Sequence, residues 1–265
     1  MKTNNYLIIG LIAFLLLSCH TAEHIVILCT NDTHSQILPD QNNKGGYARR
    51  LGIIDTVRAQ NKHVIMVDDG DFSQGTLFFN IFKGEVEIAG MNAMQYDAVA
   101  VGNHEFDNGV ATFAGQMAKA TFPLTCANYD VSNSVLAPYV KPYLIVKEGC
   151  VKVGIFGLGI SPANLIEDTE FVPVRYLNPD SAAIAVAAFL KEKKKCDVVI
   201  CISHLGSRMD AIIIGDSRYV DLVCGGHTHE MINRTIPNRD GKPVHLIQSG
   251  KGAANLGRVD LYLKR

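Results

Sequence analysis

The stretch HIVILCTNDTHSQ, residues 24–36, joins an apolar run to a polar loop. Its residues 25–28 are continuously apolar, which is typical of a strand that is covered on both faces. Asp32 and His34 follow directly and are two residues apart. A polar loop is the commoner explanation of such a pair taken alone, so the remainder of the chain decides whether the two side chains act together.

Composition favours one compact domain of a size typical of catalytic domains. The chain has 265 residues, of which 48% are hydrophobic and 19% charged. It is therefore long enough to bury a large core, either in one domain or in two small ones. A net charge of −1 gives no sign of a surface for a nucleic acid polymer or of a disordered tail. Because no Pro/Ser-rich linker, low-complexity tract or repeat occurs, we expect a single domain over residues 19–265.

The first nineteen residues, MKTNNYLIIGLIAFLLLSC, have the character of an export signal. Lys2 precedes an apolar run over residues 6–17, which is short for a membrane span of about 20 residues but fits a secretory signal. Residues 16–19, Leu-Leu-Ser-Cys, resemble a bacterial lipobox. That resemblance implies a signal peptide over residues 1–18, lipid attachment at Cys19, and a lipoprotein anchored to the membrane of the bacterial cell envelope. The alternatives are an ordinary signal peptide and an uncleaved anchor.

Short apolar runs rich in Val and Ile recur along the chain. They occupy residues 24–28, 63–67, 98–101, 151–156, 198–202, 222–224, 244–247 and 259–263. Helical patterns lie between them, over residues 49–60 and over residues 178–195, where Asn178 and Pro179 suit a helix start. Two runs meet at Glu148-Gly149, which predicts a hairpin. The predicted class is α/β with mixed sheets.

Six cysteines follow residue 19, and several lie within apolar runs. Cys29, Cys201 and Cys224 are examples, and a Cys in such a run usually behaves as a small buried hydrophobe. No Cys-x-x-Cys pair occurs, so zinc-ribbon and redox motifs have little support. An oxidising compartment permits disulfides, but the spacing leaves the pairing open.

Five of the predicted strands are followed at once by side chains that commonly bind metals, and five of the nine histidines lie there. In chain order these side chains are Asp32, His34, Asp71, Asn103, His104, Asp107, His204, His227 and His229. In open α/β sheets the carboxyl ends of the strands form the edge where ligands bind. The sequence therefore predicts that these side chains converge at one edge.

A cluster of imidazoles and carboxylates is costly to bury unless a cation pairs with it. The set contains nitrogen and oxygen ligands without a thiolate, which excludes a Cys-rich structural zinc site. It also holds too many ligands for one tetrahedral ion. Two metal ions that share a bridging carboxylate are the economical interpretation.

The motifs NDTH, GDFSQGT, GNHEFDNG, SHLG and GGHTH, which begin at residues 31, 70, 102, 203 and 225, resemble those of the calcineurin-like metallophosphoesterases. Within that family they look most like the catalytic domain of the 5′-nucleotidases, and the likeness covers residues 24–265. The resemblance implies a four-layer α/β/β/α sandwich. It also implies hydrolysis of phosphate monoesters, foremost 5′-nucleotides, by water that two divalent ions (Zn, Mn, Co or Fe) activate.

The resemblance also implies a role for each residue at a matching motif position. One ion would be held by Asp32, His34, Asp71 and His229. The other would be held by Asp71, Asn103, His204 and His227, so that Asp71 bridges the two. His104 matches the catalytic histidine that stabilises the transferring phosphoryl group, and Asp107 would orient it. A cap for the helix that begins near Asn108 is the alternative role of Asp107.

Substrate choice stays open at this stage. The 5′-nucleotidases usually carry a second, C-terminal domain that binds the nucleoside, whereas this sequence ends at Arg265 after its last predicted strand. A separately encoded protein with that domain is a candidate partner, and whether it supplies the nucleoside site is left open. A phosphodiesterase and a thiosulfohydrolase-like enzyme are alternatives that use the same site. A non-catalytic, surface-anchored binding subunit is a further alternative, but every predicted ligand position is filled, which argues against it.

Overall fold

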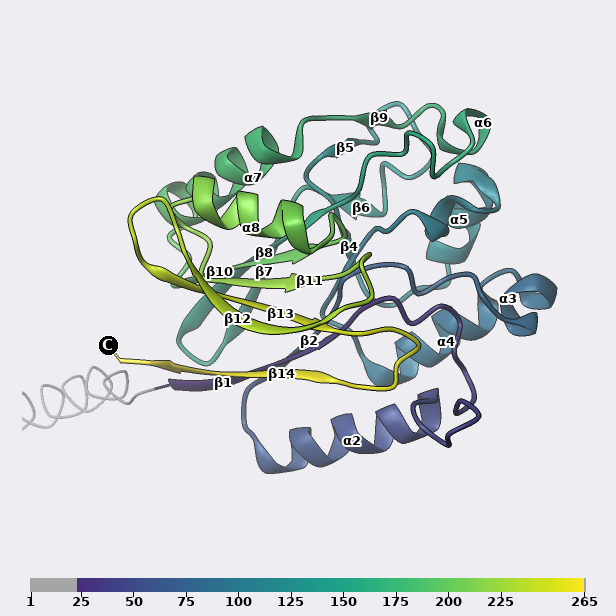
Figure 1. Cartoon of the computed structure of the whole chain (residues 1–265), viewed down its shortest axis with the longest axis horizontal. Coiled ribbons are helices and arrows are strands. Elements are labelled where there is room, and N and C mark those ends of the chain that lie inside the picture. The colour runs from purple at the N-terminus through teal and green to yellow at the C-terminus, as the bar shows by residue number, and fades with distance from the viewer. Residues whose placement is uncertain (1–22, 265) are drawn as a thin grey trace, which may run out of the picture.

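The structure is a computed structural model that describes residues 23–264. The predicted signal segment 1–18 and the predicted lipid attachment site Cys19 lie outside this range. Two six-stranded sheets pack face to face, and helices cover their outer faces (Figure 1). Among the described helices, none combines the length and apolar character that a membrane span requires.

The first sheet has the strand order β14-β1-β2-β3-β4-β6. Its strands are β1 (Glu23–Thr30), β2 (Val64–Asp68), β3 (Ala98–Ala100), β4 (Leu124–Thr125), β6 (Val140–Lys141) and β14 (Gly257–Leu263). All neighbours run parallel except β14, which pairs antiparallel with β1. The first and last described strands, β1 and β14, are therefore neighbours in this sheet.

The second sheet has the order β12-β13-β11-β10-β8-β7. Its strands are β7 (Leu144–Glu148), β8 (Val151–Leu158), β10 (Val198–Ser203), β11 (Leu222–Gly225), β12 (Met231–Pro237) and β13 (Pro243–Ser249). The inner strands are parallel, and the edge strands β7 and β12 are antiparallel to their neighbours. Glu148 pairs with Val151, so the predicted hairpin and the predicted mixed sheets are confirmed.

Helices connect the strands, and a two-stranded ladder joins β5 (Tyr129–Asp130) to β9 (Arg175–Tyr176). The helices are α2 (Tyr47–Gln60), α3 (Leu77–Phe82), α4 (Glu85–Met94), α5 (Gly109–Met117), α6 (Asp168–Phe171), α7 (Pro179–Ala188) and α8 (Ser207–Asp216). The side chain of Asn178 accepts a hydrogen bond from the Ser181 N–H at 2.9 Å, which confirms the predicted helix start. A short π-helical turn over Phe189–Lys193 follows α7.

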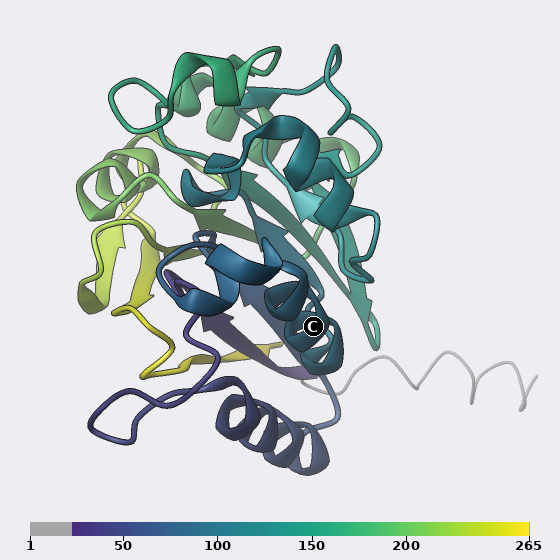
Figure 2. The ribbon, with the colours of Figure 1, turned by 90° about the vertical axis from the view of Figure 1, so that its right-hand side faces the viewer.

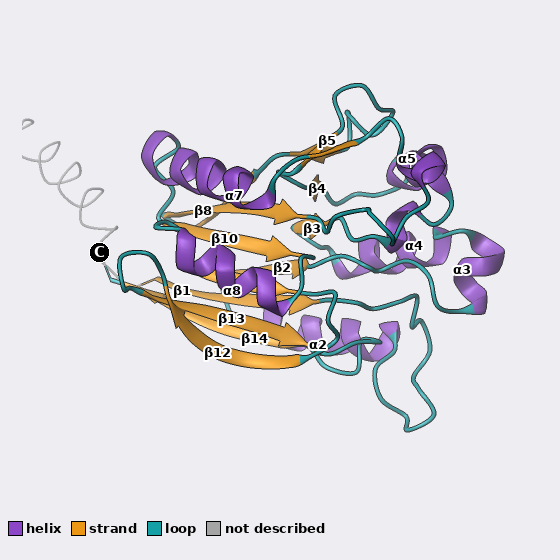
Figure 3. Cartoon of the chain, turned by 45° about the horizontal axis from the view of Figure 1, so that its top comes forward, coloured by secondary structure: helices purple, strands orange, loops and turns teal. Residues whose placement is uncertain are grey.

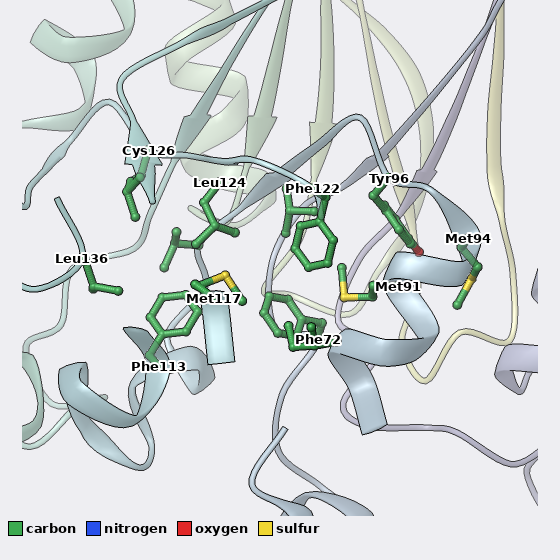
Figure 4. Packing of buried hydrophobic residues seen from close by; sticks show 14 of the residues in the cluster. Phe72, Met91, Met94, Tyr96, Phe113, Met117, Phe122, Leu124, Cys126 and Leu136 are labelled. Carbon is green, nitrogen blue, oxygen red and sulfur yellow. The ribbon is translucent and has the colours of Figure 1, made fainter. Parts of the chain in front are cut away.

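Three apolar layers alternate with the sheets and explain why the strands are continuously apolar. Successive side chains of a strand point to opposite faces, so each strand serves two layers. Ile25 and Ile27 lie in the layer between the sheets, whereas Val26 and Leu28 pack toward α2, α4 and α5. Figure 4 shows the layer beneath these helices, and Figure 2 shows the helices that cover the first sheet. A third layer lies under α7 and α8, which completes the predicted α/β/β/α sandwich.

The carboxyl ends of the parallel strands lie on one side of the molecule. Figure 3 shows the arrowheads of β8 and β10 pointing toward the side from which α3 and α5 project. The backbone N–H of Asp32, after β1, donates to the Gly70 carbonyl oxygen after β2 at 3.0 Å. The side chain of His204, after β10, contacts the Asp69 carbonyl oxygen at 2.8 Å. Both sheets thus contribute their strand-end loops to the same edge.

Candidate functional site

The loops at this edge are tied to one another by backbone hydrogen bonds. The N–H of His34 donates to the Asp71 carbonyl oxygen at 3.0 Å, so the loops after β1 and β2 run side by side. The N–H of His227, from the second sheet, donates to both carboxylate oxygens of Asp32, at 3.1 and 2.9 Å. Predicted site residues from three strands are therefore brought into direct contact.

Five of the predicted ligands have a left-handed backbone conformation. Their φ angles are 47° at Asp32, 44° at His34, 55° at Asp71, 71° at His227 and 57° at His229. Residues with a Cβ seldom adopt this region, and such strain gathers at functional sites. The unfavourable backbone conformation at these positions directs the five side chains toward a common centre.

Two glycines let the loops approach one another. At Gly70, where φ is +94°, an added Cβ would lie 2.7 Å from the backbone nitrogen of Gly102. At Gly102 an added Cβ would lie 2.2 Å from Oδ1 of Asp71. Any larger residue at either position would displace the loop or the carboxylate of Asp71, so both glycines are needed for the geometry of the site.

One group of potential ligands consists of Asp32, His34 and His229, whose ligand atoms all lie within 4.8 Å of one another. The Nε2 atoms of the two histidines are 3.0 Å apart, and Nε2 of His229 lies 3.3 Å from Oδ1 of Asp32. Burial lowers the pKa of His34 to about 4. Its imidazole is therefore neutral at pH 7, which is the form that binds a metal ion.

A second group consists of Asp71, His204 and His227, with the same spread of ligand atoms, and His34, Asp71 and His104 form a further group of this kind. Nε2 of His204 lies 2.9 Å from Oδ2 of Asp71, and both side chains are almost fully buried. Burial opposes the charged imidazole, but the Asp71 carboxylate outweighs it and raises the pKa of His204 to about 10. Positive charge is thus strongly favoured beside Asp71, as a cation site requires.

Asn103 supplies a test of whether a metal ion fits. Its side chain is 4% exposed, and its Oδ1 has no hydrogen-bond partner among the described residues. The next residue, His104, donates its backbone N–H to Oδ1 of Asp71 at 2.9 Å, so Asn103 lies beside the second group. Because an unpaired buried carbonyl oxygen is costly, an oxygen-binding cation here would satisfy it. The donor set fits divalent ions.

His104 and Asp107 form a pair at the border of this centre. Nδ1 of His104 lies 2.9 Å from Oδ2 of Asp107, and their side chains are 28% and 29% exposed. Burial lowers the pKa of His104, but the hydrogen bond to Asp107 and the charge of Asp71 outweigh it, so the net pKa is raised. The ring of His104 lies edge-on to that of His34, with centroids 5.3 Å apart. Asp107 thus holds Nδ1 of His104 through a hydrogen bond.

Residues 25–231 of the chain match the calcineurin-like phosphoesterase family. The chain belongs to this family. Snake venom 5′-nucleotidase of Crotalus adamanteus is 34% identical over 267 residues, which cover 89% of this chain and 45% of the venom protein. The 5′-nucleotidase of Homo sapiens is 32% identical, and the match covers 92% of this chain and 46% of the human protein. The chain therefore spans about half the length of these curated relatives.

Solved structures confirm the predicted fold. The 5′-nucleotidase precursor of Thermus thermophilus superposes with a TM-score of 0.82 at 28% identity, covering 90% of this chain and 51% of that chain. Sulfate thiohydrolase SoxB of the same species has a TM-score of 0.78 at 16% identity, a likeness that shows the fold only. As a member of the calcineurin-like phosphoesterases the chain is expected to use divalent metal ions, and the two groups of side chains described above could hold them.

Glu105 is a site residue of this phosphoesterase that the sequence reasoning missed. Its carboxylate is 3% exposed and accepts three backbone N–H groups, from Asp71 at 3.0 Å, Gly102 at 2.7 Å and Ser73 at 3.1 Å. It therefore clamps the loop of Asp71 to the loop of Asn103. The available signal was an acidic residue inside the GNHEFDNG motif, but the sequence does not tell which acidic side chain turns inward.

A cavity of about 530 Å³ adjoins the site of the phosphoesterase next to Asp107. Its lining consists of Phe106, Asp107 and residues 164–170. The volume is within the range of small-molecule sites. Since Asp107 both lines this cavity and binds His104, a molecule in the cavity can contact the residue that holds His104.

Proposed function

We propose that the protein is a metal-dependent phosphoesterase that hydrolyses phosphate monoesters, with 5′-nucleotides as the substrate class. The observation that carries the proposal is the convergence of nitrogen and oxygen donors from five strand ends, with the His104–Asp107 pair beside them. Its relatives named 5′-nucleotidases, at 31–34% identity, support the choice of substrate class.

We assign the ligands of two divalent ions as follows. The first ion takes Asp32, His34, Asp71 and His229, and the second takes Asp71, Asn103, His204 and His227. When bound, such ions activate water for attack on phosphorus and offset negative charge on the phosphate oxygens. The ring orientation of His204 is set by the Asp69 carbonyl oxygen at Nδ1, which leaves Nε2 toward the centre.

His104 is assigned as the catalytic histidine. Asp107 occupies its Nδ1, so Nε2 is left to donate a hydrogen bond to an oxygen of the phosphoryl group. The raised pKa keeps a larger fraction of His104 protonated near neutral pH than an isolated imidazole would have. A fixed donor of this kind stabilises the charge that builds up on the phosphoryl oxygens in the transition state.

The cavity beside Asp107 is assigned to the leaving group of the ester, which is released as an alcohol on hydrolysis. Its lining includes the acidic residues Glu167, Asp168 and Glu170, whose negative charge repels a phosphate. The phosphate is therefore expected to lie on the side of the histidines, while the uncharged part of the ester extends over Asp107.

A comparison of phosphate esters tests this function. The purified chain should hydrolyse p-nitrophenyl phosphate with a kcat/KM at least about tenfold above that for bis(p-nitrophenyl) phosphate, a difference of about 1.4 kcal/mol in transition-state free energy. The reason is that the monoester dianion carries one more negative charge for the cations and His104 to offset. A His34→Ala/His227→Ala variant from the same purification controls for contaminating phosphatases. Preferred hydrolysis of the diester would make the protein a phosphodiesterase.

AMP in the same assay addresses nucleoside recognition. The chain spans about half the length of its curated relatives. We propose that recognition of base and ribose draws on the part of those proteins that this chain does not match, and that a separate protein with a domain equivalent to that part can act as the partner. AMP and p-nitrophenyl phosphate should then show similar kcat/KM without the partner, and the partner should raise the value for AMP much more. A strong preference for AMP without it would place the nucleoside site within residues 23–264.

We further propose that Cys19 carries the lipid of an exported bacterial lipoprotein in the cell envelope. Cys19→Ala should abolish incorporation of a fatty-acid label, because the acceptor thiol is gone. It should also release the protein from the membrane fraction, since two or more acyl chains anchor a protein stably whereas one binds only marginally. Cys150→Ala removes an exposed cysteine and serves as the matched control that keeps the label. Unchanged membrane partition of the Cys19→Ala protein would indicate an uncleaved anchor instead.

A further inference from the structure

A second cluster of ligand-type side chains lies between the two sheets, apart from the candidate phosphoesterase site. It consists of Cys29 at the end of β1, Asp69 after β2 and Cys224 in β11. One ligand atom from each residue lies within 4.8 Å of the others. Their exposed fractions are 1%, 0% and 0%, so solvent does not reach them.

Strand alternation directs all three side chains into the same layer. Cys29 and Cys224 belong to the apolar cluster between the sheets. Asp69 follows Val67 of that cluster by two positions, and its backbone N–H donates to the Thr30 carbonyl oxygen at 2.8 Å, which continues the pairing of β2 with β1. The carboxyl group of Asp69 therefore enters a layer that is otherwise composed mainly of Ile and Val side chains.

Asp69 has no partner that explains its burial. Both oxygens of its carboxyl group lack a hydrogen-bond partner among the described residues. The carboxylate of Glu105, buried to a similar extent, accepts three backbone N–H groups. A buried carboxyl group without such bonds is costly, so the atoms next to Asp69 should include a ligand that satisfies it.

We propose that Cys29, Asp69 and Cys224 bind a metal ion with affinity for sulfur, such as Zn²⁺, in a closed structural site. Two thiolates and a carboxylate are suitable ligands for Zn²⁺, which in structural sites has four ligands in a tetrahedron. The hydroxyl of Ser249 is a candidate fourth ligand, because it is buried and has no partner among the described residues. A Cβ built on Gly257 would lie 2.7 Å from this hydroxyl and 2.4 Å from the Cys29 sulfur, so the two groups are neighbours.

A metal ion accounts for all three residues, whereas a disulfide between Cys29 and Cys224 would leave Asp69 unpaired. Binding releases the protons of the two thiols to solvent and changes no oxidation state. The ion would also hold the backbone of Asp69, whose carbonyl oxygen is 2.8 Å from Nδ1 of His204. The site would thus stabilise the position of His204, one of the histidines assigned to the catalytic centre.

Cobalt spectroscopy tests the proposal. The full chain is produced in medium supplemented with Co²⁺, because the buried ligands require that the ion enter while the chain folds. Thiolate ligands give Co²⁺ a strong charge-transfer absorption in the near ultraviolet, whereas the catalytic centre as assigned offers only nitrogen and oxygen. The wild-type chain should show this absorption, with about one equivalent of Co²⁺ per chain bound through sulfur.

Three variants and one control decide the assignment. Cys29→Ala and Cys224→Ala should each lose the charge-transfer absorption. Cys201→Ala should keep it, because Cys201 is equally buried but lies on the helix-covered face of β10. Asp69→Asn keeps both thiols and should weaken Co²⁺ binding at this site at least about tenfold, since loss of even an outer partner of a ligand costs 10- to 100-fold.

Three results would overturn the proposal. They are a folded wild-type chain without the absorption, an absorption that survives both cysteine variants, and a Cys29–Cys224 disulfide detected by mass spectrometry under non-reducing conditions. Hydrolysis is not the readout, so a failure of this proposal is distinct from a failure of the phosphoesterase proposal. If a cysteine variant does not fold, the wild-type spectrum and Asp69→Asn still decide.

Discussion

Chelation of the purified chain should reduce its hydrolysis of p-nitrophenyl phosphate to the rate in buffer, and Mn²⁺, Zn²⁺ or Co²⁺ should restore it. All charge stabilisation in the proposed mechanism, apart from His104, depends on ions that the seven assigned ligands hold. The side chains of His34 and His229 are 17% and 36% exposed, so a chelator can reach this centre. The measurement is the initial rate, with metal content determined in parallel by elemental analysis.

The control for this prediction is readdition of Ca²⁺, which prefers six to eight oxygen ligands and should restore little activity at a centre with four imidazoles. Full activity in a sample with verified absence of transition metals would contradict the two-ion mechanism. It would leave the His104–Asp107 pair as the remaining candidate for the catalytic machinery.

His104→Ala and His229→Ala should both lower turnover strongly, but only the second should lower metal content. Nε2 of His229 lies 3.0 Å from Nε2 of His34, where a shared ion is assigned, so its loss removes a metal ligand. His104 binds Asp107 through Nδ1 and is assigned to the phosphoryl group. Its loss should reduce kcat about 10²- to 10³-fold, the usual effect of removing one transition-state donor.

His245→Ala provides the matched control, because His245 is a partly buried histidine in β13 that belongs to neither ligand group. That variant should keep both metal content and turnover. Equal loss of metal in His104→Ala and His229→Ala would show that His104 is a ligand. Unchanged kcat in His104→Ala would remove it from the catalytic step.

The sequence by itself was sufficient for the class of fold and for the strand-end cluster. The buried strands are short, continuously apolar runs such as residues 25–28, and parallel strands present their carboxyl ends at one edge. Asp32 and His34 could therefore be assigned to the same place as Asp71 before any contact was known. The family resemblance rested on five motifs in order, of which GNHEFDNG and GGHTH together are the most specific.

Elements with a weak apolar signal could not be predicted. β12 is an edge strand whose side chains are mostly exposed, so it has no apolar run, and strands of two residues such as Leu124–Thr125 are too short to show a period. The left-handed conformation of Asp32 and its neighbours was also hidden. It arises because the loops must turn sharply at the crowded edge, and only the packed loops impose that constraint.

Contacts between the two sheets were decided only by tertiary structure. Cys29 and Cys224 are far apart in the chain and have the appearance of ordinary buried hydrophobes, and Asp69 stands among other acidic residues. They meet because the two sheets pack face to face in a particular register, which depends on the sum of many side-chain volumes. Glu105 likewise became part of the site only when Gly102 and Asp71 came close enough to share its carboxylate. Strand patterns report which face a side chain takes, whereas its partner on the opposite sheet is set by packing.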